Sequence, residues 1–228
     1  MGGLLVTGSD TGAGKSVVSA AILAALVQAG RRVRAHKPAL SGLDEPAGDW
    51  PRDHELLASL TGQRPEEVAP IRFGPAVSPH LAAELAGAPL APDALLAAAR
   101  QALADAGPDG ALVVEGVGGL LVPLCPGYAV RDLARELGLP VVVAARAGLG
   151  TINHSLLTLQ AARTAGLDVR AIVLGPWPAQ PDAMLRSNRE TIAREGGVEV
   201  AVLGQVAEPS PRALADAGAP LAPERWLG

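Results

Sequence analysis

The chain has 228 residues, of which 49% are hydrophobic, and its formal net charge is −4 at pH 7. It contains no basic run, which argues against a nucleic-acid partner, and no apolar run approaches the roughly 20 residues that a membrane span needs. A single cysteine, Cys125, excludes an internal disulfide, and the four histidines show no metal-ligand spacing. No signal peptide precedes the first strand, so we predict a cytoplasmic chain that forms one α/β domain over residues 1–228.

Apolar, β-rich segments alternate with segments of helical periodicity along the chain. In chain order we predict a strand at 4–8, a helix at 15–30, a strand at 32–37, helices at 53–62, 78–87 and 92–107, a strand at 111–116, a helix at 130–138, a strand at 140–148, a helix at 151–166, a strand at 169–175, a helix at 182–197 and a strand at 198–204. This rhythm indicates an α/β fold with a doubly wound, mostly parallel sheet and helices on both faces. Ligands bind such sheets beyond the carboxyl ends of the strands.

The segment GSDTGAGKS, residues 8–16, follows a predicted strand and opens a predicted helix. Backbone N–H groups of such a turn, with the helix N-terminus behind them, form a cradle for phosphate oxygens. In this pattern Lys15 reaches the β- and γ-phosphates and the Ser16 hydroxyl ligates Mg²⁺. The strict motif has its first glycine where this chain has Ser9, and Gly8 lies one place earlier. Because strand, loop and helix occur in the required order, we predict a nucleotide site rather than a chance glycine-rich turn.

Three further polar residues are candidates for this site. Glu115 ends an apolar strand and precedes glycines 116, 118 and 119, which let backbone approach a ligand closely. A phosphate loop needs an acidic residue at a neighbouring strand end for Mg²⁺, so we interpret Glu115 as a ligand rather than a solvated charge. Asp53, at the start of a predicted helix, could be a second ligand, a helix cap or both. Thr11 could cap the first helix or donate its hydroxyl to a phosphate.

The chain uses lysine at only two positions. Of its 19 basic residues, all are arginine except Lys15 and Lys37. Lysine carries a compact ammonium on a flexible stem, and its pKa can shift when it is buried. Lys37 ends the second predicted strand, which we expect beside the first, so that its side chain lies over the phosphate loop. A lysine at a strand end is ordinarily a snorkelling surface residue, but its rarity in this chain favours a functional role.

The segments that carry these residues resemble one family, the dethiobiotin synthetases. The segments VTGSDTGAGKS, KPALSG, DHELL, SPHLAAE, EGVGGLLVPL and GLGTINHSLLT occur in the family's order between residues 6 and 158, and a weaker likeness continues to about residue 204. EGVGGLLVPL together with GLGTINH is specific to the family, whereas the phosphate loop alone would not be.

The resemblance implies an ATP- and Mg²⁺-dependent ring closure of 7,8-diaminononanoate with CO₂ or bicarbonate. A carbamate formed on one amine attacks the γ-phosphate, and the second amine then expels phosphate, which gives dethiobiotin and ADP. Lys37, Lys15 and Thr11 would be catalytic, and Ser16, Asp53 and Glu115 would hold Mg²⁺. The nucleotide would contact Gly12, Ala13, Gly14, Lys15, Ser16, Val17, Glu115, Gly116, Val117, Gly118, Gly175, Pro176, Gln205 and Val206. The family is a homodimer, so the substrate would contact Ser41, Pro79 and Gly118 of one copy and Leu149, Thr151 and Asn153 of the other.

The chain departs from the family pattern at several positions. Ser16 replaces the usual threonine, and Gly12 stands where some members have a glutamate that contacts the substrate amine. Many members place an adenine-reading asparagine near position 175, where this chain has Gly175 and Pro176. Trp177 could stack on a base instead, or could simply be buried. Because base selectivity rests on specific polar contacts, we hypothesise that several nucleoside triphosphates, CTP among them, are accepted.

Two alternatives use a similar fold. A switch ATPase of the partition or metallochaperone type usually has a further lysine near the start of the loop, where this chain has Gly8 and Ser9, and lacks KPALSG. A metal carrier would also require a Cys or His pair, which is missing here. A cobyrinate amidase-type ligase would need a glutaminase domain, and the chain is too short to include one. The synthetase interpretation fits best.

Overall fold

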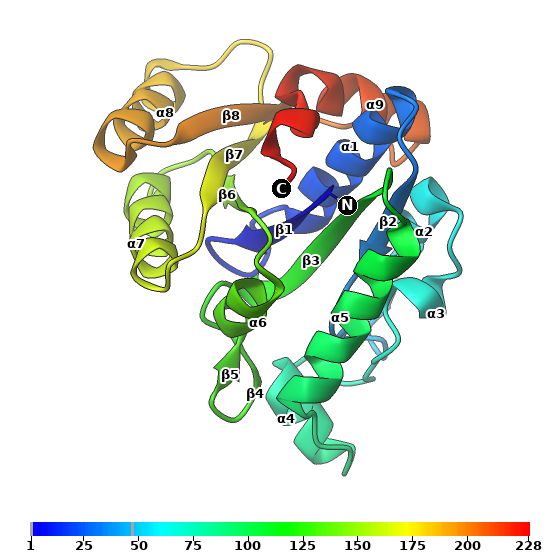
Figure 1. Ribbon diagram of the computed structural model, residues 1–228. Helices are drawn as coiled ribbons and strands as arrows, with labels where there is room; N and C mark the ends of the chain where they lie inside the picture. The colour runs from blue at the N-terminus through cyan, green and yellow to red at the C-terminus, as the bar shows by residue number, and fades with distance from the viewer. Residues whose placement is uncertain (1, 47) are drawn as a thin grey trace.

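Six parallel strands form the central sheet of the protein, whose computed structural model describes residues 2–46 and 48–228 (Figure 1). The strands lie in the order β2-β3-β1-β6-β7-β8. They are β1 (Gly2–Gly8), β2 (Val33–His36), β3 (Ala111–Gly119), β6 (Val141–Arg146), β7 (Val169–Trp177) and β8 (Glu199–Gly204). The predicted doubly wound parallel sheet is therefore confirmed.

Helices cover both faces of this sheet (Figure 1). One face carries α1 (Lys15–Gln28), α2 (Asp53–Thr61) and α9 (Pro211–Gly218). The other carries α5 (Pro92–Ala106), α6 (Val130–Leu137), α7 (Thr151–Thr164) and α8 (Ala183–Gly196). In the part of the chain that the structure describes, no helix combines the length and the apolarity that crossing a bilayer requires.

Several short elements complete the chain. The predicted helix at 78–87 is α4 (Pro79–Leu85). Unpredicted are α3 (Pro65–Val68), the hairpin of β4 (Pro123–Cys125) and β5 (Tyr128–Ala129), α9, and the 3-10 turns η1 (Ala219–Leu221) and η2 (Pro223–Trp226). Most of these elements span two to four residues, too few to show a helical or strand periodicity.

A hydrophobic core lies on each face of the sheet, and the alternation of side chains along a strand decides which of the two cores a residue joins. Leu4 and Val6 of β1 face the α1 side, whereas Leu5 faces the α5–α7 side. In β2 and β3, the residues at 33, 35, 111 and 113 also face the α1 side. Because side chains alternate with a period of two, residues 37 and 115 continue toward that same side. The phosphate loop and the first turn of α1 lie there too.

One expectation about strand order is wrong. We predicted β2 beside β1, but β3 lies between them and pairs with both in parallel. Ala35 is in register with Val113, and His36 with Val114. The side chain that follows β2 therefore has β3, which carries Glu115, as its neighbour. Strand order depends on how the crossover connections pack, and the sequence of one strand does not encode it.

A glutamine closes the free edge of β2. The Gln63 amide accepts a hydrogen bond from the Ala35 backbone N–H at 2.7 Å and donates one to the Ala35 carbonyl at 3.2 Å. Two residues later, the Lys37 backbone N–H donates to the Val68 carbonyl at 2.8 Å. An edge strand leaves a row of backbone groups without a strand partner, and here a side chain and the end of α3 satisfy them.

We expect Gln63→Leu to destabilise the protein by roughly 1–3 kcal/mol, because it leaves the buried backbone groups of Ala35 without partners. Urea unfolding followed by circular dichroism measures the change. Gln101→Leu on the exposed face of α5 is the matched control and should shift stability by about 0.5 kcal/mol or less. Equal losses in the two variants would show that the amide does not hold the edge.

Candidate active site

The phosphate loop joins β1 to α1 and depends on glycine at both ends. A Cβ at Gly8 would lie 2.6 Å from the Asp10 carbonyl oxygen and 3.1 Å from Lys15 Nζ, so only glycine fits beneath the lysine. At Gly14, the N-cap of α1, the space is open, but φ is +84°, a left-handed conformation that glycine adopts at low cost. The glycine that the loop requires at its start is therefore Gly8, and a serine at position 9 is compatible with the loop.

Four polar side chains from four different elements meet beside this loop. Lys37 Nζ donates to Glu115 Oε1 at 2.5 Å and to Asp53 Oδ2 at 2.7 Å. Ser16 Oγ, in the first turn of α1, donates to the same Glu115 Oε1 at 3.0 Å. The structure thus brings together the predicted lysine and all three predicted metal ligands.

The lysine and the glutamate of the cluster are buried, whereas the Asp53 side chain is 41% exposed. Lys37 is 3% exposed and Glu115 is fully buried. Burial alone would lower the pKa of Lys37, but the carboxylates of Glu115 and Asp53 outweigh it and raise that pKa above its ordinary value. For Asp53, burial opposes ionisation, yet Lys37 and Ser16 bring its pKa down to about 2. Lys37 is therefore protonated and Asp53 is ionised at neutral pH.

Lys15 has a different environment. It is 8% exposed, and the shortest side-chain contact found for its Nζ reaches the Asp10 carbonyl at 3.5 Å. Burial first, and then the positive charge of Lys37, lower the pKa of Lys15. An anion bound beside the loop would counteract both effects and raise the pKa of Lys15, because its negative charge stabilises the protonated ammonium.

The cluster has the donor chemistry that a divalent cation prefers. Glu115 Oε2 is buried and has no hydrogen-bond partner among the described residues. Across residues 2–46 and 48–228, no group of three or more His, Cys, Asp or Glu side chains could hold a metal on its own. Two carboxylates and a hydroxyl, with water and phosphate to complete the shell, suit the hard-oxygen preference of Mg²⁺.

Two cavities adjoin at the loop. The first, here called the lysine cavity, measures about 410 Å³ and is lined by Thr11, Gly12, Gly14, Lys15, Ser16, Val17, Lys37, Leu40, Ser41, Trp50, Pro51, Asp53, Leu56, Val117 and Gly118. The second, here called the β7–β8 cavity, measures about 710 Å³ and is lined by Gly12, Ala13, Gly14, Val17, Val18, Trp50, Arg146, Ala147, Gly148, Leu149, Gly175, Pro176, Leu185, Leu203, Gly204, Gln205 and Val206. Their shared wall is the phosphate loop, so one elongated ligand could extend through both.

Most predicted nucleotide residues line one of these two cavities, and two do not. Glu115 lies behind the lysine cavity and reaches it through Ser16 and Lys37. Gly116 is buried, and a Cβ there would meet Val130 at 2.9 Å, so this glycine serves packing rather than a direct contact.

Two of the alternatives left open by the sequence are now decided. The N-cap of α1 is Gly14, without a side-chain cap, so Thr11 is not the cap, and it lines the lysine cavity instead. Asp53 is the first residue of α2 after the N-cap Arg52, and its carboxylate turns to Lys37. For both residues the capping interpretation is wrong.

The predicted substrate residues are distributed unevenly. Ser41 lines the lysine cavity and donates its hydroxyl to the Val77 carbonyl at 2.6 Å, which holds the segment that leads to Pro79 alongside. Pro79 itself is buried and lines neither cavity. On the far side of the loop, Leu149 is 90% exposed, whereas the Thr151 side chain is buried at the start of α7. Asn153 is exposed on α7.

Two residues that sequence reasoning did not select also belong to the site. Trp50 lines both cavities, and Arg146 donates from Nε to the Gly12 carbonyl at 3.1 Å. A Cβ at Gly12 would lie 2.8 Å from Arg146 Nη2, so the guanidinium fills the space of the missing side chain. Trp50 could have been found as an aromatic residue in a polar loop, whereas Arg146 resembles any strand-end arginine. By contrast, Trp177 lines a separate hollow beside α8 and neither of the two cavities, so this geometry does not support its stacking on a base.

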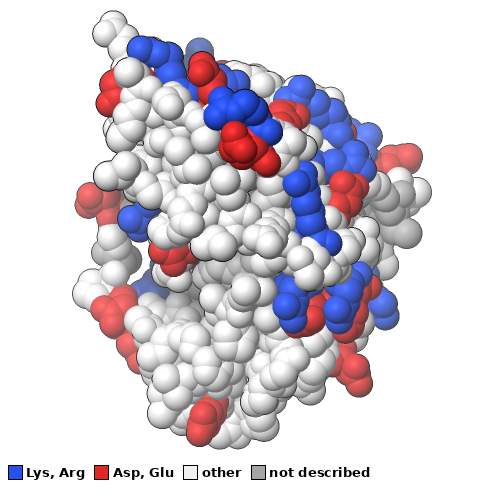
Figure 2. All heavy atoms as spheres, turned by 90° about the vertical axis from the view of Figure 1, so that its left-hand side faces the viewer, with Lys and Arg blue, Asp and Glu red and all other residues white. Residues whose placement is uncertain are grey.

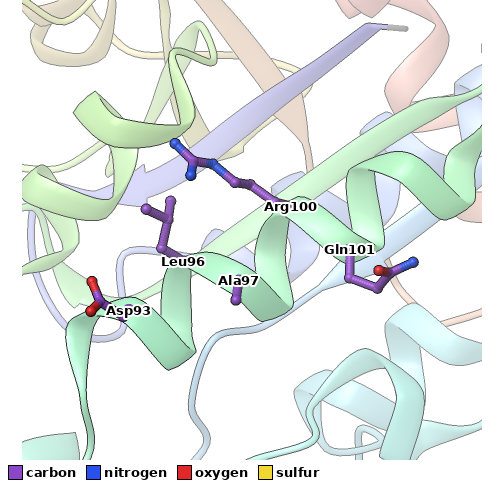
Figure 3. A pocket seen from close by; sticks show the side chains of 5 residues that line it. All are labelled: Asp93, Leu96, Ala97, Arg100 and Gln101. Carbon is purple, nitrogen blue, oxygen red and sulfur yellow. The ribbon is translucent and has the colours of Figure 1, made fainter.

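A depression elsewhere on the surface has a different character. Figure 3 shows its lining, which comes entirely from α5: Asp93, Leu96, Ala97, Arg100 and Gln101. Arg100 donates from there to the Glu136 carbonyl at 3.3 Å and so ties α5 to α6. No part of the phosphate loop reaches this depression, and we place the candidate site in the two adjoining cavities instead.

Two solved structures share the fold at low sequence identity. The MinC:MinD cell division complex from Aquifex aeolicus aligns with a TM-score of 0.57 and 13% identity over 99% of this chain and 96% of that chain. Chloroplast FtsY from Physcomitrella patens aligns with a TM-score of 0.52 and 17% identity over 94% of this chain and 64% of that chain.

Sequence comparisons identify closer relatives. A family model described as an AAA domain matches residues 2–211. The protein named ATP-dependent dethiobiotin synthetase from Rhodococcus jostii is 40% identical over 225 residues, which cover 98% of this chain and 94% of that one. The protein of the same name from Anaeromyxobacter dehalogenans is 44% identical over 196 residues, which cover 85% of each. The chain therefore belongs to the ATP-dependent dethiobiotin synthetase family.

Proposed function

We propose that this protein closes the ureido ring of dethiobiotin from 7,8-diaminononanoate and CO₂, driven by the γ-phosphate of a nucleoside triphosphate. The observation that carries the proposal is the cluster of Lys37, Glu115, Asp53 and Ser16 beside a phosphate loop that contains Lys15. Family membership and the motif segments support the same reaction.

In the phosphoryl-transfer step two anions must approach each other, so the main requirement of the site is positive charge. A carbamate oxygen must approach the γ-phosphorus of a polyanion, and cations must screen that approach. Lys15 and Lys37 both line the lysine cavity and would supply this charge to the reacting phosphate. Positioning and charge account for most of the catalysis of phosphoryl transfer, and no covalent intermediate with the protein is required.

The remaining polar groups would place the reactants. The backbone of the phosphate loop holds the β- and γ-phosphates at the N-terminus of α1. Thr11 and Ser41 line the lysine cavity and would donate to phosphate and carbamate. After transfer, the second amine attacks the carbamate carbon, the C–O bond to phosphate breaks, and the proton of the amine passes to the departing phosphate or to water.

We propose that Mg²⁺ binds through Ser16, Asp53 and Glu115, directly or through water. Glu115 Oε2 is buried and has no partner among the described residues, and this supports the proposal because a buried polar atom without a partner is costly and a bound cation would supply one. When bound, Mg²⁺ would neutralise charge on the β- and γ-phosphates. The described residues contain no larger carboxylate cluster that would compete for the ion.

A switch ATPase of the partition type is the alternative that the fold alone would allow, since a chain of the MinC:MinD complex shares this fold. Two features weigh against it. The loop places serine rather than lysine at position 9, and the KPALSG segment puts Lys37 and Ser41 in the lysine cavity. A small anionic substrate beside the γ-phosphate explains those side chains, whereas nucleotide-driven dimerisation does not require them.

We further propose that the chain acts in the cytoplasm, as one α/β domain, and as a homodimer that associates through the α7 side. This side shows a wide area without charged side chains (Figure 2). Leu149 is 90% exposed. Leu121 and Leu157, each 56% exposed, line a groove that also contains Arg131 and Arg135 of α6. Several large apolar side chains exposed on one side are typical of an interface. Asn153 and Leu149 would then reach the substrate cleft of the other copy.

The first prediction concerns the reaction itself. Incubation with diaminononanoate, bicarbonate, Mg²⁺ and ATP should give dethiobiotin, detected by mass spectrometry. Lys37→Arg should lower turnover by about a hundredfold or more, because the broader guanidinium cannot take the place of a compact ammonium between two carboxylates. Arg64→Lys on the surface is the control. Near-normal turnover in Lys37→Arg would contradict the proposed catalytic role of Lys37.

The second prediction concerns association. Leu157→Glu should convert a dimer into a monomer in sedimentation velocity runs and should lower product formation, because it buries a charge in an apolar interface. Leu85→Glu, a change at a leucine that is 63% exposed on α4, should leave the sedimentation coefficient unchanged. A monomeric wild-type chain with full activity would contradict the shared cleft.

The third prediction concerns the base. At Gly175 and Pro176 the β7–β8 cavity presents backbone rather than the family's adenine-reading asparagine, Trp50 adds an aromatic face, and the lining also includes the Gln205 amide. Rates with ATP, CTP, GTP and UTP at equal concentration should therefore agree within about tenfold. Trp50→Ala should raise KM for all four to a similar degree, in line with the roughly 1–3 kcal/mol of base stacking, and Trp177→Ala should not. A hundredfold preference for ATP would end this hypothesis.

A further inference from the structure

The ammonium of Lys37 occupies one oxygen of each carboxylate in the proposed Mg²⁺ site and leaves Glu115 Oε2 without a partner among the described residues. Its Nζ lies 2.5 Å from Glu115 Oε1 and 2.7 Å from Asp53 Oδ2. Ser16 Oγ, the third proposed ligand, donates to the same Glu115 Oε1 at 3.0 Å. A cation held between Ser16 and Glu115 would therefore meet an ammonium already bound to the shared oxygen.

The Lys37 ammonium and a divalent cation would be unfavourable beside each other. An ammonium and a divalent ion on one buried carboxylate repel each other strongly, because little water screens them there. In addition, the role proposed for Lys37 places its ammonium against the transferred phosphate and the carbamate. In the structure, two of its three N–H donors are directed to carboxylates instead.

The side chain has the freedom to move while its backbone stays fixed. The Lys37 N–H is bonded to the Val68 carbonyl at 2.8 Å, and Gln63 holds the strand two residues earlier. Lysine has a flexible four-carbon stem, and Lys37 already lines the lysine cavity of about 410 Å³. A rotation of the stem alone could carry the ammonium from the carboxylates toward the phosphate loop.

We propose that Lys37 and the divalent cation are alternative occupants of the Asp53–Glu115 pair, so that the ammonium holds both carboxylates until the cation arrives with the nucleotide and then turns toward the reacting anions. This inference rests on the proposed function and adds an order of events to it. Lys37 blocks the free divalent ion, and only the ion that a polyphosphate brings displaces it. The same displacement places the catalytic ammonium where the substrate binds.

The two-lysine composition allows a direct test. With ¹⁵N-lysine labelling, the side-chain ammonium spectrum of the full-length protein can contain at most two signals, and Lys37→Gln assigns them. ADP with a chelator should shift the Lys15 signal and leave the Lys37 signal in place and protected from exchange. ADP with Mg²⁺ should shift the Lys37 signal and speed its exchange with water. A Lys37 signal that keeps its position and protection at saturation with ADP and Mg²⁺ would overturn the proposal.

Calorimetry with Mg²⁺ alone gives a second, independent readout. We expect Lys37→Gln to bind Mg²⁺ about tenfold more tightly than the wild type in the absence of nucleotide, because the competing ammonium is gone. Its amide can still donate to a carboxylate, which favours a folded variant. Lys15→Gln is the matched control, since it removes an equal charge nearby that touches neither carboxylate. Equal gains in Mg²⁺ affinity in both variants would show that the loss of any nearby positive charge is sufficient, and this result would overturn the proposed exchange.

Failure of this inference can be told from failure of the proposed function. If the protein does not bind the nucleotide, the Lys15 signal will not move with ADP, and the enzymatic proposal falls with it. If the Lys15 signal moves and dethiobiotin forms while Lys37 stays on the carboxylates, the function stands and the exchange is rejected.

Discussion

The buried contact of one ammonium with two carboxylates is the interaction on which the site depends. A lysine and a glutamate could not be buried singly at this depth without a large cost in desolvation, and each is tolerated because the other is present and the half-exposed Asp53 adds a second carboxylate. Lys37 directly follows β2, whereas Glu115 lies in β3 and Asp53 in α2. The pair of ion contacts therefore fixes these three elements relative to the first turn of α1, where Ser16 joins the cluster.

The same contact links the architecture to the chemistry. Parallel strands bring their carboxyl ends to one edge of the sheet, and the period of two along each strand decides which face a side chain meets. Residues 37 and 115 continue the α1-facing positions of β2 and β3 and so converge beside the phosphate loop. A shift of one residue in either strand would turn that side chain toward the α5–α7 face and separate the charges.

The region assigned to the base is built on a different principle. Its walls include strand-end backbone, the phosphate loop, Trp50, the guanidinium of Arg146 and the amide of Gln205. Arg146 donates to the Gly12 carbonyl and occupies the volume of an absent side chain there. We propose that such a site recognises the shape and charge of a nucleotide more than the hydrogen-bonding edge of its base. Specificity would then come from the triphosphate and the second substrate, which meet at the lysine cavity.

The sequence by itself determined the alternation of strands and helices, the phosphate loop, the identity of the four cluster residues and the family, because these reside in local periodicity and in short motifs of fixed spacing. It did not determine that β3 separates β2 from β1, that Gln63 closes the edge beside Lys37, or that Trp50 and Arg146 join the site. Those features depend on contacts between residues far apart in the chain. The partners of Lys37 lie 16 and 78 positions away, and only packing of the tertiary structure brings such groups within 3 Å.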